Sequence, residues 1–190
     1  MDREPIISVW GDSLSAPEYS WCKQLEKHFV CNMHVKAVGG LPLVAFDGPP
    51  TYLVAQAQTR WRPDIVCVYL GANDGVKLAP IDDVTEAVRQ RLLPQMVYLR
   101  QLAKKRGYDL RVTLIKPPTY AHDARLSERM AKVRKVMKTA LALFPDVEST
   151  NMPWGNYDHM IDEYHPDETL HLCHAIHMAQ HWGLQPRPRT

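Results

Sequence analysis

Short apolar runs alternate with longer amphipathic stretches along this chain, and most of the runs are bounded by Gly, Pro or Asn. This alternation is typical of strand–helix–strand units that build a parallel sheet. The expected strands are residues 6–10, 34–38, 64–70, 110–115 and 146–149. The expected helices are residues 18–29, 51–59, 83–106, 125–144 and 167–182.

Local signals refine these boundaries. Pro94 removes a backbone donor inside the third expected helix, so we expect a kink or a break into two shorter helices there. Gly107 can close that helix, and Pro117 and Pro118 block continuation of the following strand. Residues 185–190 lack apolar side chains that could anchor them, and we expect them to fray.

The bulk composition predicts one domain, spanning residues 1–184. A chain of 190 residues with 45% apolar residues can bury one sizeable core and is short for two domains. The net charge of +2 gives no reason to expect nucleic acid or an anionic membrane as a partner. The four cysteines form no C-x-x-C pair, which favours reduced thiols. The apolar run after the charged first residues is too short for a signal or membrane segment, so we expect a cytoplasmic protein.

Ser13 is the candidate nucleophile. It lies in Gly11-Asp12-Ser13-Leu14-Ser15, directly after the first expected strand. Gly11 permits a tight turn out of the strand, and Asp12 can cap free amides of that turn. Gly-Asp-Ser is also a common sequence in ordinary turns, so the motif indicates a nucleophile only if a base and a carboxylate accompany it. A serine hydroxyl needs an imidazole to take its proton and a carboxylate to orient that imidazole.

His165 is the candidate base because Asp162 precedes it by three residues, close enough for a carboxylate to reach the ring. Four further histidines lie on the last expected helix. For His174, His177 and His181 the helical spacing predicts a shared, solvated outer face. His177 and His181 are spaced to chelate a metal, but no third ligand is evident, and the solvated face is favoured.

Asn73 is the candidate oxyanion donor. It lies in Gly71-Ala72-Asn73-Asp74, directly after the third expected strand. Backbone amides of Ser13 and of Gly40 or Gly39 would complete the oxyanion hole. Each of these glycine-containing segments follows the carboxyl end of an expected strand, the edge where open parallel sheets bind ligands.

Taken together, these segments resemble the four blocks of the SGNH (GDSL-type) hydrolase superfamily, with serine, glycine, asparagine and histidine in the same order. The resemblance implies a three-layer α/β/α sandwich of flavodoxin-like type with a five-stranded parallel sheet. It makes Ser13 the nucleophile and first oxyanion donor, Gly40 and Asn73 the other donors, His165 the base and Asp162 its orienter. The family's usual asparagine before the glycine is missing from residues 36–41, which leaves Gly39 as an alternative to Gly40.

The expected activity is cleavage of an acyl or acetyl ester through an acyl-serine, without a metal or organic cofactor. The substrate would be a small-molecule, glycan or lipid ester. A thioesterase or acyltransferase would use the same site. A metal-dependent phosphoesterase using Asp12, Asn73 and His165, and a binding module that retains the fold, are further alternatives. The oligomeric state is open.

Two loop regions are candidates for the pocket wall. The segment 42–50 is apolar and either walls the pocket or packs on the sheet edge. Later loops hold further candidates with the same two interpretations, namely Tyr120, Trp154, Asn156 and Met160.

Overall fold

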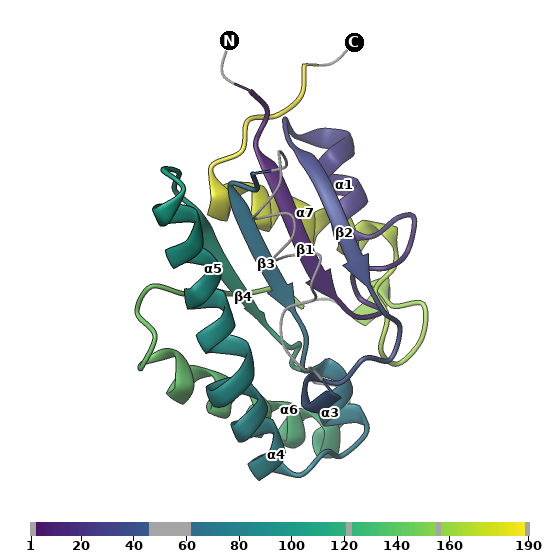
Figure 1. Cartoon of the computed structure of the whole chain (residues 1–190). Coiled ribbons are helices and arrows are strands. Elements are labelled where there is room, and N and C mark those ends of the chain that lie inside the picture. The colour runs from purple at the N-terminus through teal and green to yellow at the C-terminus, as the bar shows by residue number, and fades with distance from the viewer. Residues whose placement is uncertain (1–2, 46–61, 121–122, 155–156, 189–190) are drawn as a thin grey trace.

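Five parallel strands form the centre of the molecule, in the order β2-β1-β3-β4-β5 (Figure 1). The computed structural model describes residues 3–45, 62–120, 123–154 and 157–188, and the structural statements below refer to these residues. The strands are β1 (Ile6–Gly11), β2 (Asn32–Ala37), β3 (Ile65–Tyr69), β4 (Arg111–Lys116) and β5 (Glu148–Asn151). The predicted five-stranded parallel sheet of flavodoxin-like type is confirmed.

The central strand β3 is buried along its whole length, as its unbroken apolar sequence predicts. Its neighbour β1 pairs with it from Ile7↔Ile65 to Gly11↔Tyr69, and Gly11 also pairs with Ala37 of β2. The carboxyl ends of the three strands therefore lie side by side. This register brings the glycine-containing segments after them to one edge of the sheet.

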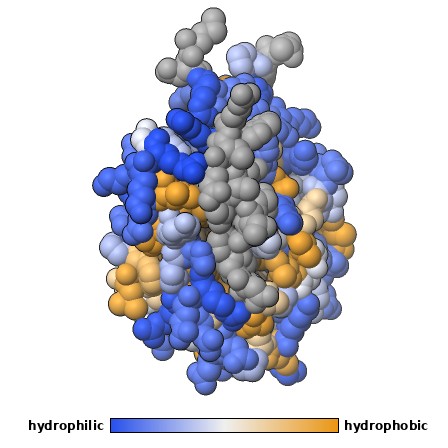
Figure 2. Space-filling model, in the orientation of Figure 1, coloured by the Kyte–Doolittle hydropathy of each residue, from blue (hydrophilic) through white to orange (hydrophobic). Residues whose placement is uncertain are grey.

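Helices cover both faces of the sheet and complete the three layers. They are α1 (Trp21–His28), α3 (Ala72–Val76), α4 (Ile81–Glu86), α5 (Leu93–Lys105), α6 (Ala124–Leu141) and α7 (Glu168–Trp182). One hydrophobic cluster joins α1 and α7 to Ile7 and Val9, and the other joins α5 and α6 to Val66 and Val68. Figure 1 shows α5 in front of the sheet with α1 and α7 behind it. Among the coloured residues of the face in Figure 2, hydrophilic ones are the most frequent, with smaller hydrophobic patches between them.

Most boundaries agree with the sequence prediction to within a few residues. The helix α1 begins at Trp21 rather than residue 18, because Ser20 N donates to Pro17 O in a turn. The helices α6 and α7 begin where the carboxylates of Asp123 and Asp167 accept hydrogen bonds from backbone amides three residues later. The expected helix at residues 51–59 lies outside the described residues.

Pro94 does not break its helix. A π-helical segment, η2 (Ala87–Leu92), joins α4 to α5, and the helix continues through Pro94 to Lys105. Proline cannot donate to a carbonyl of the preceding turn, and its ring crowds that turn. The wider π turn directly before Pro94 accommodates both effects, so the predicted split becomes a local change of helical pitch.

The prediction of a frayed tail is wrong for residues 185–188. The backbone of this segment pairs with residues 28–30, through Val30 N to Gln185 O at 2.8 Å and Arg187 N to His28 O at 2.9 Å. The Arg187 guanidinium binds the carboxylate of Glu4 at 3.0 Å and the carbonyl of Cys31 at 3.0 Å. Polar contacts anchor this segment, which an apolar pattern could not reveal.

The four cysteines are free thiols, as expected. Cys22, Cys31 and Cys67 are buried and Cys173 is exposed. Burial raises the pKa of the Cys22 and Cys67 thiols, which keeps them protonated and unreactive.

Candidate active site

Ser13 lies at the tip of a tight turn that follows β1. The carboxylate of Asp12 accepts a hydrogen bond from Leu14 N at 3.0 Å, and the carbonyl of Asp12 accepts one from Ser15 N at 3.0 Å. A Cβ atom at Gly11 would lie 2.5 Å from the Ser15 hydroxyl, so only glycine fits there. The predicted roles of Gly11 and Asp12 in shaping this turn are confirmed.

His165 reaches the Ser13 hydroxyl from the other end of the chain. Its Nε2 atom lies 3.0 Å from Ser13 Oγ, and its Nδ1 atom lies 2.9 Å from a carboxylate oxygen of Asp162. When Nδ1 donates its hydrogen to Asp162, Nε2 is free to accept one from the serine. The structure therefore brings the predicted hydroxyl, imidazole and carboxylate into one continuous chain of contacts.

Asp162 also fixes the backbone of its own loop. One of its oxygens accepts hydrogen bonds from Tyr164 N at 2.7 Å and His165 N at 2.8 Å. Partial burial acts to raise the pKa of Asp162, but these hydrogen bonds and the contact with His165 outweigh it, and the pKa is below its ordinary value. The carboxylate therefore stays ionised beside the imidazole.

Asn73 lies in α3, close to the turn that holds Ser13. Its Nδ2 atom donates to a carboxylate oxygen of Asp12 at 3.1 Å. Gly71 precedes α3 with φ +107°, a conformation that favours glycine, and a Cβ there would also require the end of the Met137 side chain, 2.8 Å away, to shift. Together these contacts hold the Asn73 amide at the same sheet edge as Ser13.

Gly40 follows β2 in the left-handed conformation, with φ +70°. It lines the same pocket as Ser13 and Asn73, whereas Gly39 is not among the lining residues. Its carbonyl accepts a hydrogen bond from Lys77 Nζ at 2.5 Å, which connects this loop to the residue after α3. Of the two glycines considered from sequence, the structure therefore places Gly40 at the site.

Asp74 is a residue whose role the sequence did not reveal. It is fully buried, and its two carboxylate oxygens accept hydrogen bonds from Leu43 N at 2.6 Å and Val44 N at 2.9 Å. Burial raises the pKa of Asp74, although these two hydrogen bonds act in the opposite direction. The contacts connect the loop after β2 to α3 and so set the position of Gly40 relative to Asn73. The sequence gives no sign of this role, because an Asp in the first turn of a helix is common whatever its contacts are.

A pocket of about 210 Å³ opens beside the Ser13 hydroxyl. Apolar and aromatic side chains form most of its wall, namely Leu14, Ala72, Val76, Tyr120 and Tyr164. Tyr120 is the expected wall residue that lines the pocket, and Trp154 packs behind it with 5.6 Å between ring centroids. Met160 packs against the hydrophobic core, and Asn156 lies outside the described residues. Of the segment 42–50, the part up to Ala45 is described, and there Leu43 packs into the core.

The expected solvated face of His174, His177 and His181 on α7 is wrong. His174 is 1% exposed, and His177 and His181 are half-buried. His171, on the same helix, is also 1% exposed. His171 Nδ1 accepts a hydrogen bond from Trp21 N at 3.2 Å, His174 Nε2 contacts Pro153 O at 2.9 Å, and His177 Nε2 contacts Thr150 Oγ1 at 2.9 Å. The helix α7 packs against α1 as well as the sheet, so two of its sides are covered. The polarity of its side chains therefore does not show which side faces the solvent.

The described part of the chain contains no candidate metal site. No three His, Cys, Asp or Glu side chains there are grouped so that they could hold a metal ion. His177 and His181, the pair considered from sequence, instead contact Thr150 and Glu148.

Comparison with solved structures agrees with this architecture. An aryl esterase from M. smegmatis superposes with a TM-score of 0.68 at 14% identity, covering 94% of this chain and 98% of the esterase. A carbohydrate acetylesterase from Sinorhizobium meliloti gives a TM-score of 0.62 at 15% identity, covering 95% and 99%. A protein named for the G-D-S-L family, from Desulfitobacterium hafniense, gives 0.63 at 12% identity, covering 92% and 98%.

No protein-family model and no curated protein matches the chain. The superposed structures show that the chain shares the fold of these esterases and of the G-D-S-L family protein. At identities this low the likeness is one of fold, and the chemistry must be argued from the site itself.

Proposed function

We propose that this protein is a serine hydrolase of the SGNH type that cleaves acyl or acetyl esters through an acyl-serine intermediate. The observation that carries the proposal is the chain of contacts from Ser13 through His165 to Asp162, with 3.0 Å and 2.9 Å between the atoms concerned. This is the geometry that a serine needs in order to lose its proton as it attacks a carbonyl. The names of the structural neighbours, which include esterases, support the same class of reaction.

In the first step His165 Nε2 takes the proton of Ser13 while Oγ bonds to the carbonyl carbon of the ester. The carbonyl oxygen becomes an oxyanion, which the backbone amides of Ser13 and Gly40 and the side chain of Asn73 would stabilise. The protonated His165 then gives its proton to the leaving alcohol. In the second step His165 activates a water molecule, which releases the acid and restores the serine.

Asp12 acts as a positioning residue in this proposal. The Asn73 amide has two hydrogens, and the hydrogen bond to Asp12 at 3.1 Å uses one of them. Asn73 also lines the pocket, so the second hydrogen is available to the oxyanion. The contact with Asp12 therefore orients the donor without consuming its capacity.

The pocket favours an apolar acyl group. Its walls carry aliphatic and aromatic side chains next to the Ser13 hydroxyl. A carboxylate on the acyl chain would lose hydration there without gaining a cation among the lining residues. A panel of oxygen esters and thioesters with neutral acyl chains, with and without an added acceptor alcohol, would separate an esterase from a thioesterase or an acyltransferase.

The test compares Ser13→Ala with Ser127→Ala, a serine on α6 outside the site. Hydrolysis of p-nitrophenyl acetate should fall at least about 10⁴-fold in the first variant and stay unchanged in the second. A fluorophosphonate probe should label the wild-type chain once, at Ser13. Full turnover in a folded Ser13→Ala variant would contradict the mechanism, and an unreactive Ser13 would indicate a binding module.

A further inference from the structure

Basic and acidic residues occupy different parts of this chain. Residues 87–141 contain 14 of the 23 lysines and arginines but only three of the 21 acidic residues, so this segment has a formal charge of +11. The rest of the chain has nine basic and 18 acidic residues, a charge of −9. The net charge of +2 hides this separation. The expectation of no anionic partner rested on the net charge alone, so it has to be reconsidered.

Most of the basic segment is helical, and the strand β4 of the sheet lies between its helices α5 and α6. The helix α5 and the later turns of α6 share one hydrophobic cluster, and the first turns of α6 (Leu126 and Met130) also reach the cluster that contains α1 and α7. On α6 the buried side chains lie on one side of the helix, and the exposed cations Arg125, Lys132, Lys135 and Lys138 lie on the other. We call these four side chains the α6 surface. Lys132 is paired with Glu128 at 2.8 Å, and the other three have no carboxylate partner in the described structure.

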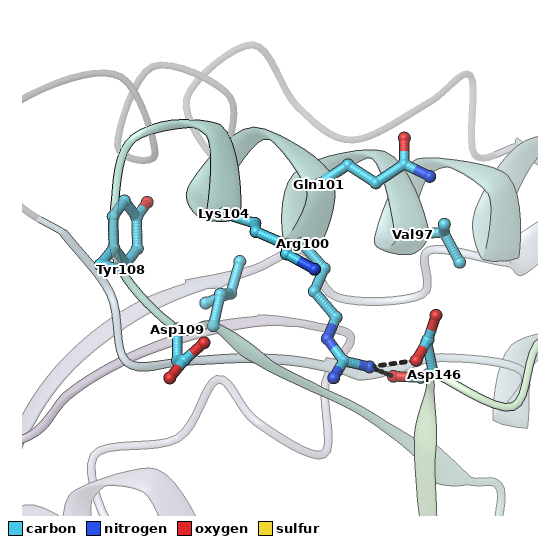
Figure 3. Close-up of a pocket in the computed structure, with 8 residues that line it drawn as sticks. Val97, Arg100, Gln101, Lys104, Tyr108, Asp109 and Asp146 are labelled. Carbon is cyan, nitrogen blue, oxygen red and sulfur yellow. Dashed lines mark hydrogen bonds and ion pairs between the residues drawn. The ribbon is translucent and has the colours of Figure 1, made fainter.

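The charge of α5 is partly neutralised where the helix faces the start of β5. Arg100 donates to the carboxylate of Asp146 at 2.7 Å, and Asp109 lines the same pocket (Figure 3). That pocket lies at the amino ends of β4 and β5, at the opposite edge of the sheet from Ser13. Its mixed charge gives no preference for an anion, whereas α6 carries four exposed cations.

Two half-buried cations lie beneath the α6 surface. Arg134 donates to Pro117 O at 2.7 Å and to Asn151 Oδ1 at 2.8 Å, both neutral acceptors. Lys116 pairs across the sheet with Asn151, and burial together with the charges of Arg134 and Lys138 lowers its pKa. Within the described residues, no carboxylate pairs with Lys116 or Arg134. The protein thus holds several cations close together without internal counterions, an arrangement that an external anion would stabilise.

An exposed apolar side chain marks the end of the same helix. Leu143 follows α6 by two residues and is 61% exposed. A nucleic acid backbone offers an aliphatic side chain little, whereas the interfacial region of a bilayer can bury it beside lysines that contact lipid phosphates. The combination of cations and an exposed leucine favours a lipid surface over a nucleic acid.

We infer that the α6 surface, together with Leu143, binds the protein peripherally to bilayers that contain anionic phospholipids. None of the described helices is long and apolar enough to cross a membrane, so contact with the bilayer would be limited to its surface. Binding does not involve Ser13 or His165. It therefore stands or falls separately from the proposed hydrolase activity.

The experiment measures co-sedimentation of the full chain with vesicles of phosphatidylcholine alone and of phosphatidylcholine with phosphatidylserine. Binding is expected only to the second kind and should weaken as salt is raised. The double variant Lys135→Glu, Lys138→Glu should lose at least about tenfold in affinity. The variant Leu143→Ser keeps every charge and should lose about fivefold or more through the missing apolar contact.

The matched control is Lys23→Glu, Lys27→Glu on α1, which changes the net charge equally on the opposite layer and should bind as the wild type does. Circular dichroism checks that each variant is folded. Absence of binding to phosphatidylserine vesicles at low salt would overturn the inference, and so would an equal loss in the control. Binding to duplex DNA in preference to these vesicles would overturn it in favour of a nucleic acid partner.

Discussion

The side-chain amide of Asn73 donates a hydrogen bond to the carboxylate of Asp12, with 3.1 Å between Nδ2 and Oδ2. The other oxygen of the same carboxylate accepts from Leu14 N at 3.0 Å. One buried side chain therefore connects the turn that carries Ser13 to the helix that carries the candidate oxyanion donor.

Asp12→Asn tests this connection. The new amide can still accept from Leu14 N, but its NH₂ group would face the NH₂ group of Asn73. We expect kcat to fall about tenfold to 100-fold, less than the loss of an oxyanion donor itself, with KM little changed. Steady-state kinetics on p-nitrophenyl acetate measure both constants. Asp82→Asn, an exposed change on α4, should leave them unaltered, and a wild-type kcat in a folded Asp12→Asn protein would show that the contact does not orient Asn73.

Asp162→Asn should remove most of the activity while the loop keeps its shape. The asparagine oxygen can still accept from Tyr164 N and His165 N, but its NH₂ group would face Nδ1 of His165 and favour the tautomer that cannot take the serine proton. We expect kcat to fall about 10³-fold to 10⁴-fold. The measurement is kcat for an activated ester, with Asp83→Asn on α4 as control. A loss below tenfold would mean that Asp162 does not orient the base.

Gly11→Ala should destabilise the fold, because the new methyl group would lie 2.5 Å from Ser15 Oγ and 2.7 Å from Ser15 Cβ. Overpacking of this kind costs about 1–3 kcal/mol. Gly39→Ala is the matched control, since no heavy atom lies within 4 Å of the position of its new methyl group. Urea unfolding monitored by tryptophan fluorescence measures both free energies. Equal stabilities for the two variants would contradict the packing argument.

The free energy of unfolding should decrease as the pH falls below about 6.5. Burial lowers the pKa of His171 to about 4 and that of His174 to about 3, so the unfolded chain takes up protons that the folded chain refuses. Their stabilising contribution is complete above the unfolded pKa of 6.5 and is lost as the pH falls towards these values. For His171 alone it amounts to about 3 kcal/mol.

The contribution of Asp12 to the free energy of unfolding depends on pH in the opposite direction. Burial raises its pKa to about 6, so its contribution is present at acid pH and is lost as the pH rises from about 4 to 6. Asp74, whose pKa burial also raises, acts in the same direction as Asp12. The pKa values of His171 and His174 depart further from their ordinary value than that of Asp12, and the lowered pKa values of Asp162 and Asp167 add to the histidine effect. We therefore expect the free energy of unfolding to rise with pH overall.

His171→Asn isolates the histidine contribution. The asparagine oxygen can accept from Trp21 N but does not titrate. Urea unfolding between pH 4 and pH 7 should give a shallower dependence on pH than in the wild type, whereas His28→Asn, an exposed change at the end of α1, should keep the wild-type slope. An unchanged slope in His171→Asn would mean that folding does not lower the pKa of His171.

The sheet and the serine–histidine pair were predictable because each rests on local signals. The apolar run at residues 65–69 marks a strand buried on both faces, and parallel strands bring their carboxyl ends to one edge whatever the helices do. Asp162 and His165 are three residues apart, so their contact needs no long-range information. The meeting of Ser13 with His165 then follows from topology.

The features that sequence analysis missed depend on contacts between distant segments. Asp74 binds amides 30 residues away, and the Arg187 side chain binds Glu4 at the far end of the chain. The histidines of α7 are polar in sequence but face Trp21 and Pro153, so tertiary packing overrides their helical pattern. The charge segregation lay within reach of the sequence but disappears in a whole-chain sum.

The ion pair between Glu4 and Arg187 holds both ends of the described chain at the amino edge of the sheet. The pocket opens at the opposite edge. A tag, a fused domain or a solid support attached through either end would thus leave the mouth of the pocket unobstructed. A short peptide joining the two ends would close the chain into a ring, and new ends could then be opened in a surface loop.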